Sequence, residues 1–244
     1  MAQEIVAITG AGSGLGKSLA IKYSQSGSHV CLLGRTKTTL MNTASQLDGE
    51  SSIYELDVTD KTNIEHVTES IIRVHGSIDC WVNNAGIGIF KPVIELTEED
   101  VNRTIDTNLI GTIFCTQEVL KVMHRQKKGC FINIISNSGK VVKKMESVYS
   151  ASKFGVRGFT EALAIECQDL NINILSAYMG NMITNLWRTT PSNEQRDSYM
   201  HPDRVAELIF ESAKHQKDIQ EENINVINHN IKKSLEINRK PIGE

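Results

Sequence analysis

The sequence predicts one α/β domain of the doubly wound type, in which helices cover both faces of a parallel β-sheet. Short apolar runs alternate along the chain with longer amphipathic segments, and turn residues separate them. Right-handed crossovers between parallel strands place the helices on both faces. The length of 244 residues suits one such domain, and no linker or internal repeat divides the chain.

The elements follow this alternation in order. We expect seven strands, at Ile5–Thr9, His29–Leu33, Ser52–Leu56, Asp79–Val82, Cys130–Ile135, Ile172–Tyr178 and Ile224–Ile227. We expect helices at Ser13–Ser26, Thr38–Leu47, Lys61–Val74, Glu98–Gln126, Val148–Asp169 and Asp203–Lys214. In such a sheet, ligands bind at the carboxyl ends of the strands.

Composition excludes several other classes of protein. The net charge of −3 and the pI near 6.2 give no indication of nucleic-acid binding. The five cysteines contain no C-x-x-C pair, which argues against a metal site and a disulfide framework. No secretory signal is visible, and no stretch approaches the ~18 apolar residues of a membrane span. We therefore expect a soluble, cytoplasmic protein without a membrane or nucleic-acid partner.

A glycine-rich loop, TGAGSGLG from Thr9 to Gly16, lies between the first strand and the first helix. Phosphates bind the N–H groups at helix N-termini, and side chains in the loop would block their approach. The G-x-G-x-x-G spacing does not fit, but T-G-x-x-x-G-x-G does, with Gly10, Gly14 and Gly16. A tight structural turn is the alternative, but this position favours a dinucleotide site on a Rossmann-type sheet.

The end of the second strand indicates which dinucleotide binds. It reads Leu33-Gly34-Arg35-Thr36-Lys37, without the acidic residue that typically holds the ribose of NAD. Arg35 is able to bind a 2′-phosphate through two hydrogen bonds, and Lys37 is placed to assist, so we expect NADP(H) to be preferred over NAD(H). A solvated Arg35, or one stacked on adenine, is the alternative. Asp57 and Val58, after the third strand, are placed to meet the adenine ring.

Tyr149 and Lys153 are four residues apart in a helical pattern, which puts them on one helix face. A tyrosine titrates near ~10, and a neighbouring ammonium lowers that pKa by favouring the phenolate. The pair therefore suits general acid/base chemistry at a carbonyl or an alcohol. Polar residues stand nearby at strand ends or mid-helix, namely Ser136, Asn84 and Asn108.

The motifs TGAGSGLG, NNAG and S-x12-YSASK, with the Asn108 helix, resemble the short-chain dehydrogenase/reductase family. The resemblance extends to about residue 184 and includes 3-oxoacyl-carrier-protein reductase-like members. It implies that Tyr149 gives a proton to the substrate oxygen and that Lys153 holds the nicotinamide ribose. It also implies that Ser136 hydrogen-bonds the substrate oxygen and that Asn108 anchors a water of the proton relay. Ser138 is the competitor of Ser136, whose spacing to Tyr149 fits the family.

The motifs and the resemblance together give the expected cofactor contacts. These are Gly10, Ser13, Gly14, Leu15, Gly16, Arg35, Asp57, Val58, Asn84, Ala85, Gly86, Tyr149, Lys153, Gly180, Ile183 and Thr184. The chain departs from the family at Met179, where a proline is usual. No metal is expected.

The predicted function is hydride transfer between NADP(H) and a small carbonyl or secondary alcohol substrate, with Tyr149 as the general acid/base. The alternative is a catalytically inactive dinucleotide sensor or scaffold on the same fold. It is disfavoured because a sensor does not need the complete set of Ser136, Tyr149, Lys153 and Asn108.

The remaining expectations concern organisation and partners. Residues 1–228 are expected to form the catalytic domain, with a substrate lid at about 185–200, and residues 229–244 a polar tail. A basic group at the end of the long helix is able to dock an acyl carrier protein, although cations also simply favour helix C-termini. This group is His124, Arg125, Lys127 and Lys128. A homodimer or homotetramer is also expected.

Overall fold

The computed structural model describes residues 3–184, 186, 199–215, 221–226 and 236–239. Its strands are β1 (Ile5–Thr9), β2 (His29–Gly34), β3 (Ser51–Glu55), β4 (Cys80–Asn83), β5 (Gly129–Ile134), β6 (Ile172–Met179), β7 (Glu221–Val226) and β8 (Glu236–Arg239). Its helices are α1 (Gly14–Gln25), α2 (Lys37–Ala44), α3 (Lys61–His75), α4 (Glu98–Ile105), α5 (Gly111–Gln126), α6 (Ser147–Glu166) and α8 (Pro202–His215). The shorter turns are η1 (Val93–Glu95), η2 (Asp106–Ile110) and η3 (Asn137–Gly139).

The strands form one sheet in the order β3-β2-β1-β4-β5-β6-β7-β8. The doubly wound α/β fold predicted from the sequence is confirmed, but the strand count of seven is wrong. An eighth strand, β8, pairs antiparallel with β7 and lies in the segment predicted as a polar tail. No apolar run marks this strand, because Ile237 stands alone among polar residues and the strand forms through backbone pairing.

Strand order reverses around β1, which pairs with β2 on one side and β4 on the other. The crossovers to these two neighbours run in opposite directions, so the chain leaves a crevice beyond the carboxyl ends of β1 and β4. The glycine-rich loop follows β1 directly, and the NNAG motif begins in the last residue of β4. The topology therefore brings both motifs to the same crevice.

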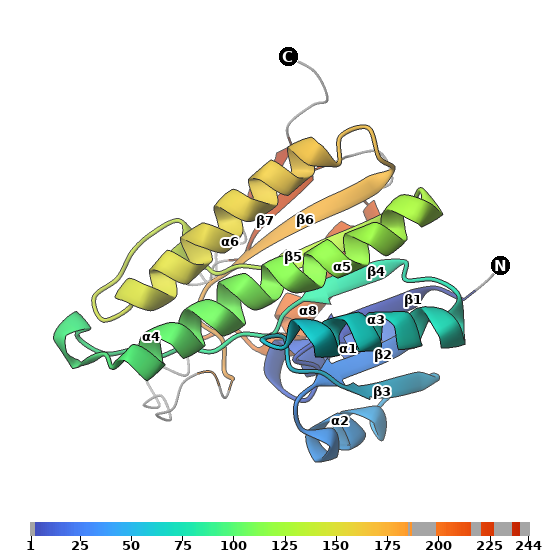
Figure 1. Cartoon of the computed structure of the whole chain (residues 1–244), viewed down its shortest axis with the longest axis horizontal. Helices are drawn as coiled ribbons and strands as arrows, with labels where there is room; N and C mark the ends of the chain where they lie inside the picture. The colour runs from blue at the N-terminus through green and yellow to red at the C-terminus, as the bar shows by residue number, and fades with distance from the viewer. Residues whose placement is uncertain (1–2, 185, 187–198, 216–220, 227–235, 240–244) are drawn as a thin grey trace.

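Two apolar layers hold the helices to the sheet, because successive strand residues point to opposite faces. Figure 1 shows α3, α5 and α6 across one face, with α1 and α8 behind the sheet. The strand residues packed with α1 and α8 include Val6, Ile8, Val82, Ile132 and Leu175. Those on the other face include Ala7, Trp81, Phe131 and Ile174. All are almost fully buried, as a fold covered on both faces requires.

The predicted helix Glu98–Gln126 is two helices, α4 and α5, joined by the π-helical turn η2. Asn108 lies in this turn, and its side chain bonds both the N–H and the carbonyl of Ile87 in the loop after β4. The Thr112 hydroxyl donates to the Asn108 carbonyl at 2.8 Å. A π-turn carries one extra residue, which periodicity alone does not reveal and which is frequent at functional sites.

No helix in the described part of the chain combines the length and the apolar character needed to cross a bilayer.

Gly16→Ala tests the close approach of α1 to the glycine-rich loop. An added Cβ would lie 2.3 Å from the Gly10 carbonyl oxygen and 2.6 Å from Asn84 Nδ2. We expect the free energy of unfolding to fall by about 1–3 kcal/mol, because the backbone must shift. Chemical denaturation measures this change.

Gly158→Ala in α6 is the matched control, since its Cβ would meet nothing within 4 Å. This variant should gain roughly 0.5–1 kcal/mol from helix propensity. Equal stabilities for the two variants would contradict the close approach.

Candidate active site

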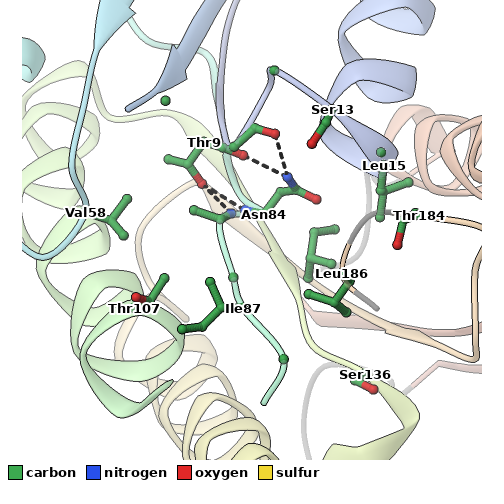
Figure 2. Close-up of a pocket in the computed structure, with 18 of the residues that line it drawn as sticks. Thr9, Ser13, Leu15, Val58, Asn84, Ile87, Thr107, Ser136, Thr184 and Leu186 are labelled. Carbon is green, nitrogen blue, oxygen red and sulfur yellow. Dashed lines mark hydrogen bonds between the residues drawn. The ribbon is translucent and has the colours of Figure 1, made fainter. Parts of the chain in front are cut away.

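A cavity of about 450 Å³ opens at the carboxyl edge of the sheet. Most of the residues predicted from the sequence lie in its wall: Gly10, Ser13, Gly14, Leu15, Arg35, Asp57, Val58, Asn84, Ala85, Gly86, Ser136, Tyr149, Lys153, Gly180 and Thr184. Figure 2 shows Ser13, Leu15 and Thr184 on one side of the cavity and Val58 and Thr107 on the other. Gly16, Asn108 and Ile183 do not line it.

The N-terminus of α1 forms the floor near the glycine-rich loop. Gly10 and Gly14 have positive φ angles of 67° and 51°, a conformation that favours glycine. Ser13 caps the helix without a side-chain hydrogen bond, and the first turn contains no acidic residue. The backbone N–H groups and the positive end of the helix dipole therefore suit a bound anion such as a pyrophosphate.

Thr9 and Asn84 join the glycine-rich loop to the end of β4 (Figure 2). The Thr9 hydroxyl accepts from the backbone N–H groups of Asn84 and Ala85, both at 2.9 Å, and donates to the Val82 carbonyl. Asn84 Nδ2 donates to the carbonyls of Thr9 and Gly10 at 2.9 and 3.4 Å. The Asn84 side chain thus fixes the loop, and the sequence interpretation missed the part played by Thr9.

Two serines after β5 have different partners. The Ser136 hydroxyl accepts from the backbone N–H of Ser138 at 3.1 Å and is hydrogen-bonded to Tyr149. The Ser138 hydroxyl donates to Glu146 Oε2 at 2.6 Å. Ser136, rather than Ser138, therefore presents its hydroxyl beside the tyrosine. Glu146 is a buried carboxylate that the sequence interpretation did not identify.

Tyr149 and Lys153 are both buried on α6, one helical turn apart. Burial raises the pKa of Tyr149 to about 12, while the hydrogen bond with Ser136 lowers this pKa and the Glu146 charge raises it. Burial also lowers the pKa of Lys153 to about 8. Lys153 Nζ donates to the Ile134 carbonyl at 3.0 Å and lies 5.9 Å from the centre of the tyrosine ring.

Asn108 lies behind the cavity wall rather than in it. Its amide bonds the backbone of Ile87 in both directions and donates to Ser152 Oγ at 3.1 Å. A Cβ on Gly86 would lie 3.2 Å from Asn108 Oδ1 and 3.8 Å from Lys153 Nζ. Asn108 therefore holds the loop after β4 against α6, close to the lysine.

The end of the cavity that is more distant from Tyr149 is bordered by the residues that follow β2. Arg35 is exposed in this wall beside Thr36 and Thr39, and within the described residues no carboxylate forms an ion pair with it. The Asp57 carboxylate accepts from the backbone N–H and the hydroxyl of Thr59 at 2.9 and 2.8 Å. The Asp57 carboxylate is therefore occupied by hydrogen bonds within its own turn. Arg35 gives this end of the cavity a positive charge.

The end of the cavity that contains Ser136 and Tyr149 is mostly apolar. Its wall contains Ile87, Ile89, Met182 and Leu186, with Arg103 and Thr107 from α4 and η2. Arg103 and Thr107 carried no motif, so sequence reasoning did not find them. Within the predicted lid, Leu186 lines the cavity and Met200 pairs with Met182, while residues 185 and 187–198 lie outside the described part. Ile183, predicted as a cofactor contact, is 41% exposed and does not line the cavity.

The basic group predicted as a carrier-protein dock lies at the C-terminus of α5, directly before β5 begins. This is the amino edge of the sheet, whereas the cavity opens at the carboxyl edge. Lys128 also donates to Asp79 at 2.7 Å, within an ion pair of the fold. An acyl group attached to a carrier docked there would have to cross the sheet, so the position does not favour this partner.

Comparisons with known proteins match this arrangement. The family model "short chain dehydrogenase" matches residues 4–195. Sepiapterin reductase of Chlorobaculum tepidum is 31% identical over 220 residues, which cover 86% of this chain and 90% of that protein. An uncharacterized oxidoreductase of Staphylococcus aureus is 29% identical over 227 residues, covering 93% and 97% of the two chains.

Solved structures agree on the fold. Levodione reductase has a TM-score of 0.84 at 25% identity, covering 93% of this chain and 96% of that chain. An alcohol dehydrogenase of Thermococcus sibiricus, complexed with 5-hydroxy-NADP, has a TM-score of 0.85 at 24% identity, covering 95% and 99%. The chain is an oxidoreductase that belongs to the short-chain dehydrogenase family.

The burial of Lys153 predicts a pH dependence of stability. The folded lysine loses its proton near pH 8 and the unfolded lysine near 10.5, so the unfolded state binds more protons between these values. Stability therefore rises with pH across this window. Relative to Lys153→Met, the wild-type free energy of unfolding should rise by about 1.4 kcal/mol per pH unit above pH 8. Urea denaturation at several pH values measures it, and parallel curves for the two proteins would contradict the burial of the charge.

Proposed function

We propose that this protein transfers a hydride between NADP(H) and a small carbonyl or secondary alcohol substrate, with Tyr149 as the general acid/base. One observation carries the proposal: Ser136, Tyr149 and Lys153 lie in the wall of the same cavity as the glycine-rich loop. The cavity can therefore hold a dinucleotide and present its reactive end to a proton-transfer group.

The cavity fits the dinucleotide along its length. The N-terminus of α1 and the positive-φ glycines provide N–H groups without side chains, which suits the pyrophosphate. A Cβ added to Gly14 would lie 3.2 Å from Thr184 Cγ2. A side chain at this position would therefore narrow the floor of the cavity. Arg35 supports NADP(H) over NAD(H), because its guanidinium is able to bind the 2′-phosphate bidentately. When bound, the nicotinamide ring donates or accepts the hydride.

The substrate oxygen is proposed to lie between the hydroxyls of Ser136 and Tyr149. In reduction, Tyr149 Oη gives its proton to this oxygen, and Ser136 Oγ donates a hydrogen bond to it. The tyrosinate left behind is unfavourable in a dry site, as its pKa of about 12 in the free protein reflects. The Lys153 ammonium, positioned by the Ile134 carbonyl, stabilises that anion when it is charged.

The remaining site residues have positioning roles in this proposal. Asn108 ties the loop at Ile87 to Ser152 of α6, which fixes the helix that carries Tyr149 and Lys153. Its role in anchoring a water of the proton relay stays a prediction. Leu186 begins the proposed lid at 185–200, and the apolar wall around it supports a substrate with an apolar body.

The alternative function, an inactive dinucleotide sensor, would use the same glycine-rich loop. It leaves unexplained why an ammonium and a phenol are buried together, since desolvation of the charge destabilises the fold. The homodimer or homotetramer, the cytoplasmic location and the carrier-protein partner stay predictions from the sequence. Exposed apolar side chains on α6, Phe154 and Ile165, support self-association.

Oxidation of NADPH with a panel of aldehydes, ketones, diketones and acyl thioesters tests the activity. Tyr149→Phe should lower kcat by roughly 10²–10⁴-fold, because the proton donor is lost. Ser136→Ala should lower turnover far more than its matched control Ser138→Ala, whose hydroxyl is directed to Glu146. NADPH binding without turnover of any carbonyl would support the sensor instead, and equal losses in the two serine variants would refute the assignment of Ser136.

Arg35→Ala tests the cofactor preference. We expect the Kd of NADPH to increase by roughly 10- to 100-fold and that of NADH to change little, because one charge-assisted contact is lost. Lys37→Ala tests the assisting role predicted for Lys37, and because Lys37 does not line the cavity we expect a much smaller increase in the Kd of NADPH. Fluorescence titration measures both constants, and tighter binding of NADH than of NADPH by the wild-type protein would overturn the NADP(H) assignment.

A further inference from the structure

Two histidines and a cysteine converge at the amino end of β2, at the opposite edge of the sheet from the cavity. His29 and Cys31 are two residues apart on β2 and so point to the same face. His75 is the last residue of α3. One ring nitrogen of each histidine and Cys31 Sγ all lie within 4.8 Å of one another.

One thiolate and two imidazoles are a donor set that suits Zn²⁺. Bond lengths of about 2.0–2.3 Å to a tetrahedral ion separate such donors by roughly 3.5 Å. The three groups are therefore already near the required spacing, and small side-chain rotations would close it. The planes of the two imidazole rings are tilted by 45° to each other, and the ring centres are 4.3 Å apart.

Hydroxyl groups from β3, the strand that pairs with β2, lie next to the two imidazoles, and Ser52 is the register partner of Cys31. Ser52 Oγ lies 3.0 Å from His29 Nε2 and 3.4 Å from His75 Nε2, and Tyr54 Oη lies 3.3 Å from His75 Nε2. A histidine that binds a metal through one nitrogen usually hydrogen-bonds through the other, which orients the ring. With the metal bound through Nδ1 of each ring, Ser52 and Tyr54 supply such partners at Nε2.

The cluster is accessible to an ion from solvent, and a fourth metal ligand lies nearby. Cys31 is fully buried and His29 nearly so, but His75 is half-buried and gives a path from solvent. Glu50 Oε2 lies 3.8 Å from His29 Nδ1, and its side chain is 82% exposed. Either this carboxylate or a water is therefore able to complete four-coordination.

We propose that His29, Cys31 and His75 bind one Zn²⁺ ion, with Glu50 or water as the fourth ligand. The ion replaces the thiol proton of Cys31, which passes to solvent. It would link the start of β2 to the end of α3, far from the dinucleotide cavity, so its role is structural. Without a metal, the same groups form only a hydrogen-bonded histidine pair, and the experiment separates these two cases.

The test is titration of the untagged, full-length protein with Co²⁺ and then Zn²⁺. We expect one equivalent of Co²⁺ to produce the near-ultraviolet charge-transfer band of a cobalt thiolate, and Zn²⁺ to abolish it. Cys31→Ala should lose the band. His75→Gln should weaken Zn²⁺ binding beyond the roughly 10- to 100-fold that loss of a second-shell partner costs. Because His75 is half-buried at a helix end, this variant should keep the wild-type circular dichroism spectrum.

His66→Gln and Cys115→Ala are the matched controls, since His66 lies exposed on the same helix and Cys115 is buried in the same apolar layer. Both should retain the band and the affinity. Absence of a thiolate band at one equivalent, or an unchanged affinity in His75→Gln, would overturn the proposal. The result does not depend on the proposed oxidoreductase activity, which reads out at the other edge of the sheet.

Discussion

The arrangement of the cavity depends on the hydrogen bonds between Thr9 and Asn84. They join the carboxyl ends of β1 and β4, the two strands between which the winding direction of the chain reverses. A reversal alone opens a crevice but does not fix the loops that border it. Here one hydroxyl satisfies two backbone N–H groups, and one side-chain amide reaches two carbonyls of the glycine-rich loop. These contacts hold the first helix, and hence its dipole, at a constant position relative to the carboxyl ends of β1 and β4.

The proposed catalytic groups, Tyr149 and Lys153, illustrate a conflict between stability and chemistry. A phenol and an ammonium are removed from water on one helix face, and each is pushed toward its neutral form. The fold tolerates this because the surrounding contacts are numerous: the lysine has a backbone carbonyl, the tyrosine has a serine hydroxyl, and Phe90 packs edge-on against the phenol ring. Shifted pKa values of this kind are typical of sites that transfer protons, whereas elsewhere in a protein the burial of ionisable groups only lowers stability.

Much of the fold and of the candidate site could be predicted from the sequence. The runs of β1, β2 and β4 are recognisable because parallel strands buried on both faces are mostly apolar. The glycine-rich loop and the Tyr149–Lys153 spacing are local patterns. Features that depend on long-range contacts were missed. Thr9 and Glu146 act through partners distant in the sequence or across a turn, and β8 forms by backbone pairing without an apolar pattern. The His29–Cys31–His75 cluster likewise exists only because α3 packs beside β2.

The π-helical turn between α4 and α5 sets the rotation of one helix relative to the other. Each residue of an α-helix turns the chain by about 100°, so one extra residue between the two helices changes which side of α4 faces inward. Arg103 on α4 lines the cavity, while α5 keeps its own apolar side on the sheet. The insertion or loss of a single residue at the turn would therefore change which side chains of α4 line the cavity, without any change in Ser136, Tyr149 or Lys153.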